Sequence, residues 1–498
     1  MQRRHSAGAD ARHHHLIGIG GTAMASLGGL LRAAGHRVTG SDEGVYPPMS
    51  DLLGDLGIPY REGYSPGNLE PRPDVVIVGN AISRGNPELE AVLDARIPYT
   101  SAAATIKEEF LRGRHSLPVA GTHGKTTTTS LLAWLLEAAG LEPSFLVGGV
   151  AENFGTSFRL TESAYFVIEA DEYDTAYFDK GPKMWHYLPD TAIVTNVEFD
   201  HADIYRDEVA YRWAFSRFIN LIPRTGTLVA GFDSPAIREL AEASFAPVES
   251  FGFEGDASAS GAGGVAAPRW RAERVEYGES VTSFDIIHDG EPWGRVASPL
   301  AGAFNVRNVL AAVAAAHAVG AAPGRVIEGL RTFRSVRRRM EIRGVVGGVT
   351  VIDDFAHHPT AVRETILATR QRYPGRRLVA VFEPRSYTAQ RREFQTSYES
   401  ALGLADAIVM GGLFHPERYS AETAMDPQAL VATLRTAGRT ADHIVEPAEI
   451  ARRVADAAES GDVVLIMSNG GFGGVHARLL DRLASRFGSD ERKAPGSP

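Results

Sequence analysis

The sequence predicts an α/β protein built from about three domains. Its 498 residues are too many for one hydrophobic core, because domains average roughly 150 residues. Short apolar segments alternate with Ala- and Leu-rich helical stretches along most of the chain, which is typical of parallel sheets with helical crossovers. Two of the apolar segments run straight into glycine-rich turns, so we expect two separate nucleotide-type units in the N-terminal half.

The first unit is expected to span residues 14–112. HLIGIGG at 15–21 predicts a strand entering a glycine turn, and the stretch 22–35 predicts a helix that ends at Gly35. Further strands are expected at 36–42 and 73–81. The turn Gly18-Ile-Gly-Gly-Thr-Ala23 has the dinucleotide-binding spacing with alanine in the last place. Alone, that spacing would favour an NAD-binding domain.

The second unit is expected to span residues 113–333 and to begin with a phosphate-binding loop. An apolar strand leads into the glycine turn, and an amphipathic helix follows it. Backbone amides at that helix N-terminus would face phosphates, Lys125 would add a positive charge, and Thr126 a hydroxyl for magnesium. The general NTPase spacing has a glycine where this chain has Val119, so a glycine turn with an incidental lysine is the alternative. The residues expected at the nucleotide are Gly121, Thr122, His123, Gly124, Lys125, Thr126 and Thr127.

Acidic residues follow the next apolar strand, at 165–174. Because ligands bind at the carboxyl ends of parallel strands, and because Mg²⁺ prefers carboxylate and phosphate oxygens, this segment predicts a metal site. A solvated acidic turn is the alternative. The strand after it ends in TNVEFDH, which places Asn196, Asp200 and His201 at a neighbouring strand end. The acidic residues are Glu169, Asp171, Glu172 and Asp174.

The third unit is expected to span residues 334–488. Strands are indicated within 348–354, 377–384, 405–412 and 462–470, with helical segments between them, as in a doubly wound sheet.

Composition narrows the classes of function. The chain is 44% hydrophobic and 22% charged, and it has no apolar run of about 20 residues, so we expect no membrane-spanning helix. The first fifteen residues lack the apolar core of a secretory signal, which favours the cytoplasm. There are no cysteines, which excludes disulfides and thiolate chemistry. A net charge of -10 argues against a nucleic-acid partner.

The order of the motifs resembles the Mur ligase family. GTHGKTTT is followed by EADEYD, TNVEFDH, Gly302-Ala-Phe-Asn-Val-Arg-Asn308 and DDFAHHP, and these segments run across most of the chain. The resemblance implies a Rossmann-like N-terminal domain that holds the UDP part of the substrate. It also implies a central P-loop ATPase-type domain that binds ATP and Mg²⁺, and a Rossmann-like C-terminal domain that binds the peptide. Residues implied at the UDP part are Gly20, Gly21, Thr22, Ser41, Asp42 and Asn80.

The same resemblance assigns roles around the ATP. Lys125, Glu169 and His201 would be catalytic, with Thr126 and Glu169 on one Mg²⁺ and Glu169 and His201 on a second. Asn305 and Asn308 would face the adenine. Arg338 or Arg339 would contact the ATP, and Asp353, with His357 and His358, would close onto the nucleotide. For the Asp and His group before Pro359, a capped helix start is the alternative.

Within the family, several segments resemble the branch that attaches the tripeptide L-alanyl-γ-D-glutamyl-meso-diaminopimelate to UDP-N-acetylmuramate during peptidoglycan recycling. These include SDEGVYPPMS, EFDHADIY, FEPRSYT and, above all, SNGGFGG at 468–474. Arg385 would pair with a peptide carboxylate, and Ser468 and Asn469, beside a flexible GGFGG, would recognise the diaminopimelate end. The branch that adds a single L-alanine is the alternative.

Two positions depart from the family pattern. Phe304 stands where the family usually has histidine, which puts a polar contact to the nucleotide in doubt. Many relatives also carry a carbamylated lysine on the helix after the metal-binding histidine, but this chain has no lysine between Ala202 and Gly226.

Two other classes of protein remain open at this stage. A nicotinamide-dependent oxidoreductase would explain the first glycine turn followed by Asp42, but it leaves GTHGKTTT and EADEYD without a role. A non-catalytic nucleotide switch would use the same phosphate loop. If the chain is a ligase, its partners are UDP-N-acetylmuramate and a murein peptide, with no nucleic acid and no membrane, and it acts as a monomer or a weak homodimer.

Overall fold

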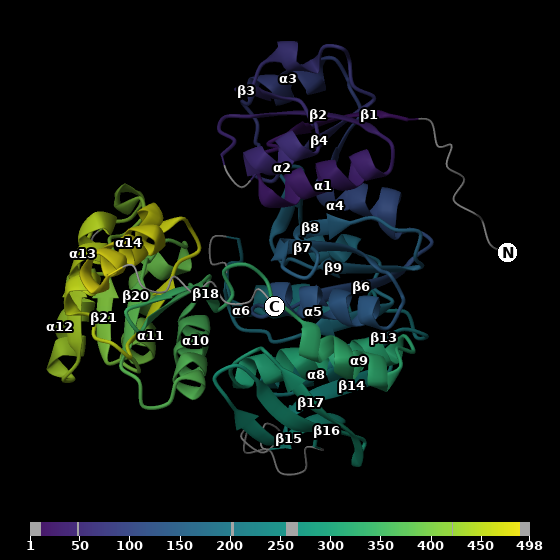
Figure 1. Ribbon diagram of the computed structural model, residues 1–498. Coiled ribbons are helices and arrows are strands. Elements are labelled where there is room, and N and C mark those ends of the chain that lie inside the picture. Colours follow the sequence, from purple (N-terminus) through teal and green to yellow (C-terminus); the bar gives the residue numbers. More distant parts are fainter. Residues whose placement is uncertain (1–10, 47–48, 201–203, 255–266, 421, 489–498) are drawn as a thin grey trace. The chain divides into compact units, whose positions relative to one another are not determined.

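The computed structural model describes residues 11–46, 49–200, 204–254, 267–420 and 422–488 (Figure 1). The chain forms two compact units. The first takes in Met1–Glu198, Val209–Arg271 and Leu310–Gly329, and the second takes in Phe199–Glu208, Ala272–Val309 and Leu330–Pro498. The domain limits expected after residues 112 and 333 stay a prediction.

The first unit begins with a five-stranded sheet in the order β3-β2-β1-β4-β5, in which every neighbouring pair is parallel. This order is that of a dinucleotide-binding half-fold, with the first strand in the middle. Helix α3 packs on one face beside β1 and β4, while α1 covers the other face, as Figure 1 shows. The elements are β1 (His13–Ile17), α1 (Thr22–Ala33), β2 (Arg37–Asp42), α2 (Met49–Asp55), β3 (Tyr60–Glu62), β4 (Val75–Val78), α3 (Pro87–Asp94), β5 (Tyr99–Ser101) and α4 (Ala102–Ile106).

A second sheet in the same unit runs β14-β13-β12-β6-β9-β7, parallel throughout, with β8 added antiparallel at the edge. Strand β6 lies between β9 and β12, so the carboxyl ends of these three strands meet at one edge of the sheet. The elements are β6 (His115–Ala120), α5 (Lys125–Ala138), β7 (Ser144–Ala151), β8 (Thr156–Arg159), β9 (Tyr165–Glu169), β10 (Asp174–Ala176), β11 (Asp179–Pro182), β12 (Thr191–Val194), α6 (Glu208–Ile219), β13 (Thr227–Gly231), α7 (Pro235–Glu242) and β14 (Val248–Phe253).

The chain passes between the two units at several points, two of which lie within β15 and α8, and β16 and β17 form an antiparallel pair. The second unit then forms a six-stranded sheet in the order β18-β19-β23-β20-β21-β22. All its pairs are parallel except β18 with β19. The elements are β15 (Trp270–Tyr277), β16 (Thr282–His288), β17 (Glu291–Ser298), α8 (Ala303–Ala318), α9 (Pro323–Thr332), β18 (Glu341–Val346), β19 (Val349–Asp354), α10 (Pro359–Arg372), β20 (Leu378–Phe382), α11 (Gln395–Leu402), β21 (Ala407–Met410), α12 (Pro427–Thr436), β22 (Thr440–His443), α13 (Pro447–Ala457), β23 (Val463–Met467) and α14 (Val475–Phe487).

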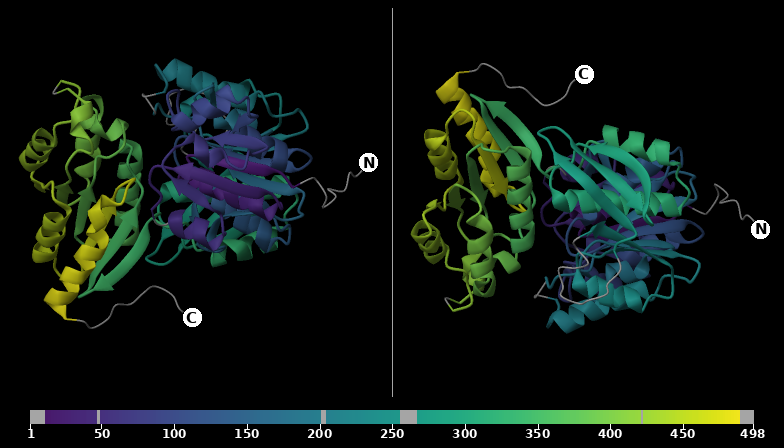
Figure 2. Two further views of the ribbon diagram at one scale, coloured as in Figure 1. Left: turned by 90° about the horizontal axis from the view of Figure 1, so that it is seen from above. Right: turned by 90° about the horizontal axis from the view of Figure 1, so that it is seen from below.

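The C-terminal sheet is buried on both faces. Leu378, Ala380 and Phe382 of β20 point to a core shared with α10, α11 and α12, whereas Val379 and Val381 point to a core shared with α13 and α14. This alternation follows from the two-residue period of a strand. The helices on either side of the green and yellow sheet are visible in Figure 2. The expected doubly wound C-terminal unit is confirmed.

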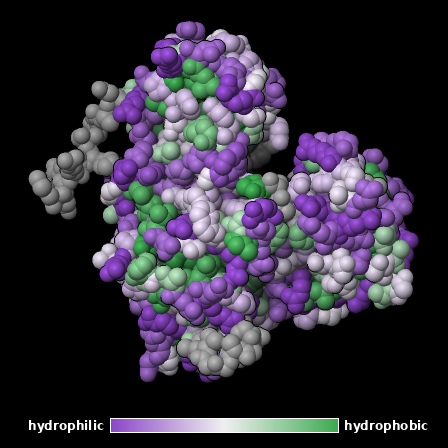
Figure 3. Space-filling model, turned by 180° about the vertical axis from the view of Figure 1, so that it is seen from behind, coloured by the Kyte–Doolittle hydropathy of each residue, from purple (hydrophilic) through white to green (hydrophobic). Residues whose placement is uncertain are grey.

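No helix in the described part of the chain is long and apolar enough to cross a bilayer. On the face drawn in Figure 3, hydrophobic residues form small separate areas among hydrophilic ones.

Helix α1 meets strand β8 through a close contact that requires glycine. Ser26 Oγ lies 2.8 Å from Ser157 Oγ across this contact. A Cβ atom at Gly29 would lie 2.1 Å from the ring of Phe158, whereas one at Gly28 would lie 3.3 Å from the end of the Ile58 side chain. The two neighbouring glycines of one helix therefore differ sharply in the space they leave.

This difference predicts opposite effects of two alanine substitutions. Gly29→Ala should lower the free energy of unfolding by about 1–3 kcal/mol, because the Phe158 ring must move. Gly28→Ala should be neutral or stabilising by up to about 1 kcal/mol, since alanine favours the helix. Urea unfolding followed by tryptophan fluorescence measures both changes. Equal effects of the two substitutions would contradict the packing described here.

Candidate active site

The turn between β6 and α5 is the centre of the site. Gly121 has a φ angle of 133°, and a Cβ atom there would lie 2.0 Å from Thr195 Oγ1, so no other residue fits. Gly124 is left-handed, with φ of 83°, and it caps α5 at its N-terminus. The first backbone amides of α5 have no partner inside the helix, and together with the helix dipole they favour an anion.

Lys125 lies over this turn and pairs with a buried carboxylate. Its Nζ donates to Glu172 Oε2 at 2.7 Å and to the carbonyl of Gly121 at 2.7 Å. The side chain of Glu172 is 0% exposed and that of Lys125 is 12% exposed. Burial alone would lower the pKa of Lys125, but the charges of Glu172 and Asp171 outweigh it and raise the pKa above its ordinary value. The lysine is therefore charged at neutral pH.

Strand β9 ends at Glu169, whose carboxylate reaches the first turn of α5. Oε1 accepts a hydrogen bond from Thr126 Oγ1 at 2.9 Å, and Oε2 accepts one from the backbone N–H of Gly148 at 2.6 Å. A Cβ atom at position 148 would lie 2.7 Å from Glu169 Oε2, so glycine is needed for this approach. A hydroxyl and a carboxylate stand side by side, which is the hard-oxygen donor set that suits Mg²⁺.

Residues that follow β12 hold the phosphate turn from the other side. Asn196 accepts from the backbone N–H of His123 at 2.8 Å and donates to the His123 carbonyl at 3.1 Å. Thr195 Oγ1 donates to the same carbonyl at 2.6 Å. His123 Nε2 lies 3.2 Å from Glu198 Oε2, so its ring turns toward the end of β12.

A second series of hydrogen bonds connects the phosphate turn to Glu172, the carboxylate that pairs with Lys125. The hydroxyl of Thr122 donates to the Glu198 carbonyl at 3.0 Å and lies 2.9 Å from the hydroxyl of Tyr211. Tyr211 in turn donates to Glu172 Oε1 at 3.3 Å. Both oxygens of Glu172 are therefore engaged, one by the lysine and one by the tyrosine. Thr127, the last residue expected in the loop, is buried at the start of α5.

His201 lies outside the described residues, so its expected role is not examined by the structure. Asp200, just before it, accepts from Thr388 Oγ1 at 2.7 Å within the second unit. Asn305 and Asn308 are buried together at the start of α8. The amide of Asn308 donates to Asn305 Oδ1 at 3.0 Å, and the amide of Asn305 donates to the Ala301 carbonyl at 2.7 Å.

Phe304 is used for packing. Its ring lies against the hydrophobic core on the α10 side of the C-terminal sheet. The position where the family usually has histidine is thus part of an apolar contact in this chain.

The N-terminal glycine turn is closed by Asp42 at the end of β2. Asp42 Oδ2 accepts from the backbone N–H of Gly20 at 2.8 Å. Gly21, Thr22 and Asn80 are exposed beside it. Ser41 is different, because it is buried and donates to Glu88 Oε1 at 2.8 Å.

Glu88 is a buried carboxylate that the sequence did not single out. His15 Nε2 lies 2.6 Å from its Oε1, and Asn68 donates to its Oε2 at 2.7 Å. Burial alone would raise the pKa of Glu88, but the hydrogen bonds from His15, Asn68 and Ser41 outweigh it and lower the pKa. The network fixes the strand ends around the turn.

In the C-terminal unit, Arg338 and Asp353 come together. Arg338 Nε lies 3.3 Å from Asp353 Oδ2, and its Nη2 donates to the carbonyls of Ser468 at 2.7 Å and Gly470 at 2.8 Å. His476 Nε2 lies 3.1 Å from Asp353 Oδ1. Burial alone would raise the pKa of Asp353, but His476 and the arginines outweigh it and lower the pKa.

The remaining residues expected to close onto the nucleotide make local contacts. His358 is the N-cap of α10, and its Nδ1 accepts from the Thr360 backbone N–H at 3.4 Å, as the capped-helix alternative expects. His357 Nδ1 lies 3.0 Å from the Phe355 carbonyl. The guanidinium of Arg339 lies over the Phe355 ring, 5.0 Å from its centre.

Arg385 and the SNGGFGG segment meet at the end of β23. The guanidinium of Arg385 stacks 3.7 Å from the centre of the Phe414 ring. A Cβ atom at Gly470 would lie 2.3 Å from Arg385 Nε, so the arginine passes flat against the backbone there. Ser468 is fully buried, and its hydroxyl donates to Glu383. Of the residues expected at the peptide, Arg385 and Asn469 line a cavity, whereas Ser468 is not among its lining residues.

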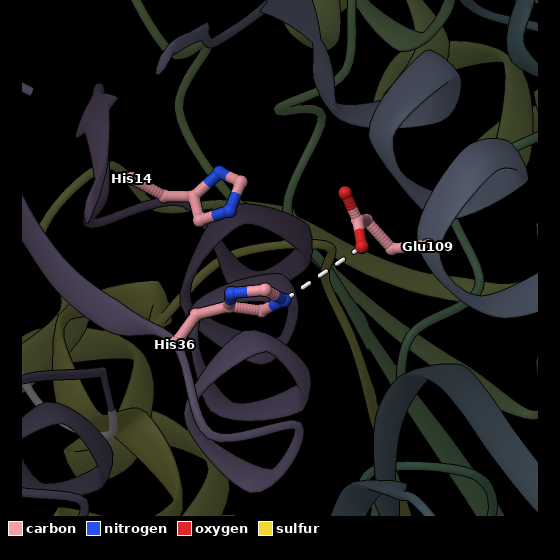
Figure 4. Close-up of side chains that lie close together, drawn as sticks. All are labelled: His14, His36 and Glu109. Carbon is pink, nitrogen blue, oxygen red and sulfur yellow. Dashed lines mark ion pairs between the residues drawn. The ribbon is translucent and has the colours of Figure 1, made fainter. Parts of the chain in front are cut away.

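His14, His36 and Glu109 face one another in the first unit, as Figure 4 shows. Their possible ligand atoms lie within 4.8 Å of one another. However, His36 Nδ1 accepts from the Arg12 backbone N–H at 3.3 Å, so in the neutral ring Nε2 carries the proton and points it toward Glu109 at 3.7 Å. A metal ligand needs a bare nitrogen on that side, so the geometry favours a hydrogen-bonded group over a metal centre.

Three sequence families match successive parts of the chain. The family described as "Mur ligase family, catalytic domain" matches residues 13–112, "Mur ligase middle domain" matches 119–316, and "Mur ligase, glutamate ligase domain" matches 338–470. The chain belongs to the Mur ligase family.

Individual relatives agree over nearly the whole chain. The UDP-N-acetylmuramate–L-alanyl-γ-D-glutamyl-meso-2,6-diaminoheptandioate ligase of Escherichia coli is 42% identical over 95% of this Mur ligase and 98% of its own length. The UDP-N-acetylmuramate–L-alanine ligase of Variovorax paradoxus is 34% identical over 95% and 96%. The crystal structure of a murein peptide ligase from Psychrobacter arcticus is 35% identical, with a TM-score of 0.69, and covers 95% of this chain and 99% of its own.

Family membership confirms the expected three-domain α/β architecture of this Mur ligase and its class as an ATP-dependent ligase. The nicotinamide-dependent oxidoreductase, suggested by the first glycine turn, is excluded. The sequence had grouped Glu172 with the acidic residues of an expected metal site, whereas in the structure it pairs with Lys125, and the sequence had not singled out Tyr211 or Gly148. The signal available in the sequence was the position of Glu172, an acidic residue just after an apolar strand that follows the phosphate loop.

The geometry predicts that Lys125→Ala abolishes ATP-dependent phosphate release by this Mur ligase, with a loss of at least about 100-fold, because the charge over the phosphate turn disappears. A coupled phosphate assay measures turnover, and calorimetry measures MgATP binding. Lys180→Ala is the matched control, since Lys180 is an exposed lysine paired with Asp174 Oδ2 at 2.6 Å. Near-normal turnover by Lys125→Ala would rule out the phosphate-loop role.

Proposed function

We propose that this Mur ligase joins L-alanyl-γ-D-glutamyl-meso-diaminopimelate to UDP-N-acetylmuramate, converting ATP to ADP and phosphate, in the recycling of peptidoglycan. The observation that carries the proposal is the identity to relatives of each branch. The tripeptide ligase of Escherichia coli is 42% identical, against 34% for the L-alanine ligase of Variovorax paradoxus, over the same 95% of this chain. The L-alanine ligase activity is the alternative.

The chemistry requires two anions to meet. The lactyl carboxylate of UDP-N-acetylmuramate attacks the γ-phosphorus of ATP, the bond to the bridging oxygen breaks, and an acyl phosphate and ADP form. The amine of the peptide then attacks the acyl carbon, loses a proton, and expels phosphate. Lys125 lies where it would neutralise charge on the bridging oxygen, and the N-terminus of α5 would hold the β-phosphate.

Thr126 and Glu169 fit a magnesium ion, because their oxygens already lie 2.9 Å apart at the phosphate turn. Glu169 with His201 is the proposed donor set for a second. Bound Mg²⁺ would polarise the γ-phosphate and weaken the charge repulsion between it and the attacking carboxylate. Glu172 has another role in this proposal: it keeps Lys125 charged and aimed over the turn until the nucleotide binds.

Further residues proposed to contact ATP belong to the second unit. Asn305 and Asn308 present adjoining amides, which suit the edge of an adenine ring. Arg338 and Asp353 are joined to the Ser468 turn, so we assign them to positioning and assign Arg339 to the ATP.

The first glycine turn is proposed to hold the UDP part. Gly20, Gly21 and Thr22 supply the start of α1, and Asn80 lies exposed beside them. Asp42 orders the turn through Gly20, and Ser41 acts indirectly through Glu88. The proposal includes the division into 14–112, 113–333 and 334–488, a cytoplasmic location, and action as a monomer or weak homodimer without nucleic acid or membrane.

The acceptor is decided by one assay. UDP-N-acetylmuramate and MgATP are supplied with either the tripeptide or free L-alanine, and phosphate release is measured. We expect release with the tripeptide at least about 100-fold faster, expressed as kcat/KM. Faster release with L-alanine would establish the alternative, and release without either amine would indicate a nucleotide switch.

Arg385→Ala should raise the KM for the tripeptide by about 10-fold or more and leave the KM for ATP nearly unchanged, because a fixed guanidinium that pairs with a carboxylate is lost. Arg392→Ala is the control, since Arg392 is exposed and does not line the cavity. An equal rise of both KM values would remove Arg385 from the peptide site.

A further inference from the structure

A cavity of about 480 Å³ lies in the C-terminal unit beside the Ser468 turn. Its size falls in the range of small-molecule sites. The side chains that matter here are Arg385, Gln390, Arg418 and Asn469, which all line it. Two of them, Gln390 and Arg418, have no role in the function described so far.

Two of the residues that line this cavity carry a buried amide oxygen without a hydrogen-bond donor. Gln390 is 4% exposed, and its Nε2 donates to the carbonyls of Arg385 at 2.9 Å and Ser386 at 3.3 Å, which fixes the orientation of the amide. Gln390 Oε1 and Asn469 Oδ1 are both buried with no hydrogen-bond partner among the described residues. Buried acceptors without a donor are costly, so a ligand with several N–H groups would be favoured.

The same cavity carries positive charge that the protein does not neutralise fully. Arg391, also at the cavity, is paired with Glu393, whose Oε1 lies 3.1 Å from its Nε. In contrast, Arg418 makes no ion pair within 4 Å and no side-chain hydrogen bond with any residue that the structure describes, and its charge interacts only at longer range with the exposed Glu417. Arg418 is therefore available for a carboxylate of a ligand.

Acceptors for an ammonium group and a cation for a carboxylate within one cavity match the zwitterionic end of an α-amino acid. Resting on the proposed function, we propose that Gln390 and Arg418 determine which diamino acid the enzyme accepts at the end of the peptide. Gln390, together with Asn469, accepts from the free ammonium of the distal amino-acid end, and Arg418 binds its carboxylate. Arg385 remains with another carboxylate of the peptide.

A lysine in place of diaminopimelate separates these contacts, because it keeps the distal ammonium and lacks the distal carboxylate. The experiment measures kcat/KM for two tripeptides, one ending in meso-diaminopimelate and one in L-lysine, with saturating UDP-N-acetylmuramate and MgATP. The enzymes are the wild type, Arg418→Gln, Gln390→Met and the control Arg392→Gln.

We expect the wild type to prefer the diaminopimelate peptide. Arg418→Gln should lose about 10- to 100-fold on that peptide and less than about 3-fold on the lysine peptide. Gln390→Met should lose activity on both peptides, because both carry the ammonium. Arg392→Gln should match the wild type on both. Thermal melting of each variant shows that the fold is kept.

An equal loss on both peptides in Arg418→Gln would overturn the carboxylate contact. Unchanged activity of Gln390→Met on both peptides would overturn the ammonium contact. These outcomes leave the ligase function intact, since that function fails only if neither tripeptide drives phosphate release in the wild type.

Discussion

The buried pair of Lys125 and Glu172 is the interaction on which the site depends. A glutamate that is fully buried is unfavourable unless a cation and hydrogen bonds compensate it, and here Lys125 and Tyr211 engage its two oxygens. The pair ties the end of β9 to the phosphate turn. It also means that a nucleotide must compete with Glu172 for the lysine, so the charge that serves the phosphates is already ordered before they arrive.

The strand order explains why this arrangement was predictable. With β6 between β9 and β12, residues 121–126, the acidic end of β9 and the Thr195–Asn196 end of β12 come to one edge. Sequence alone indicated the strands, the glycine turns and the acidic strand end, because each depends on local spacing and hydrophobic pattern. The confirmed C-terminal sheet has the same basis, because β20, β21 and β23 are uninterrupted apolar runs.

The features of the site that the sequence did not indicate depend on contacts between residues distant in sequence. The sequence around Glu88 does not indicate that His15 and Asn68 contact its carboxylate. The sequence around Gln390 does not indicate that its amide oxygen lacks a hydrogen-bond donor. Phe304 was a departure from a pattern, and only the structure shows the apolar core that accepts its ring. Ser468 was expected at the peptide, yet its burial behind Glu383 is a matter of packing that spacing does not report.

The glycines of SNGGFGG have a consequence for changing what this enzyme accepts. The segment was expected to be flexible, but a side chain at Gly470 would collide with Arg385, and one at Gly473, where φ is 54°, would meet Pro447 at 2.5 Å. A side chain at Gly470 would displace the Arg385 guanidinium, and one at Gly473 would press on the Pro447 ring, so both positions need glycine to keep the present arrangement. An engineer seeking new peptides would therefore keep both glycines and vary residues that line the cavity, such as Tyr387 and Thr423.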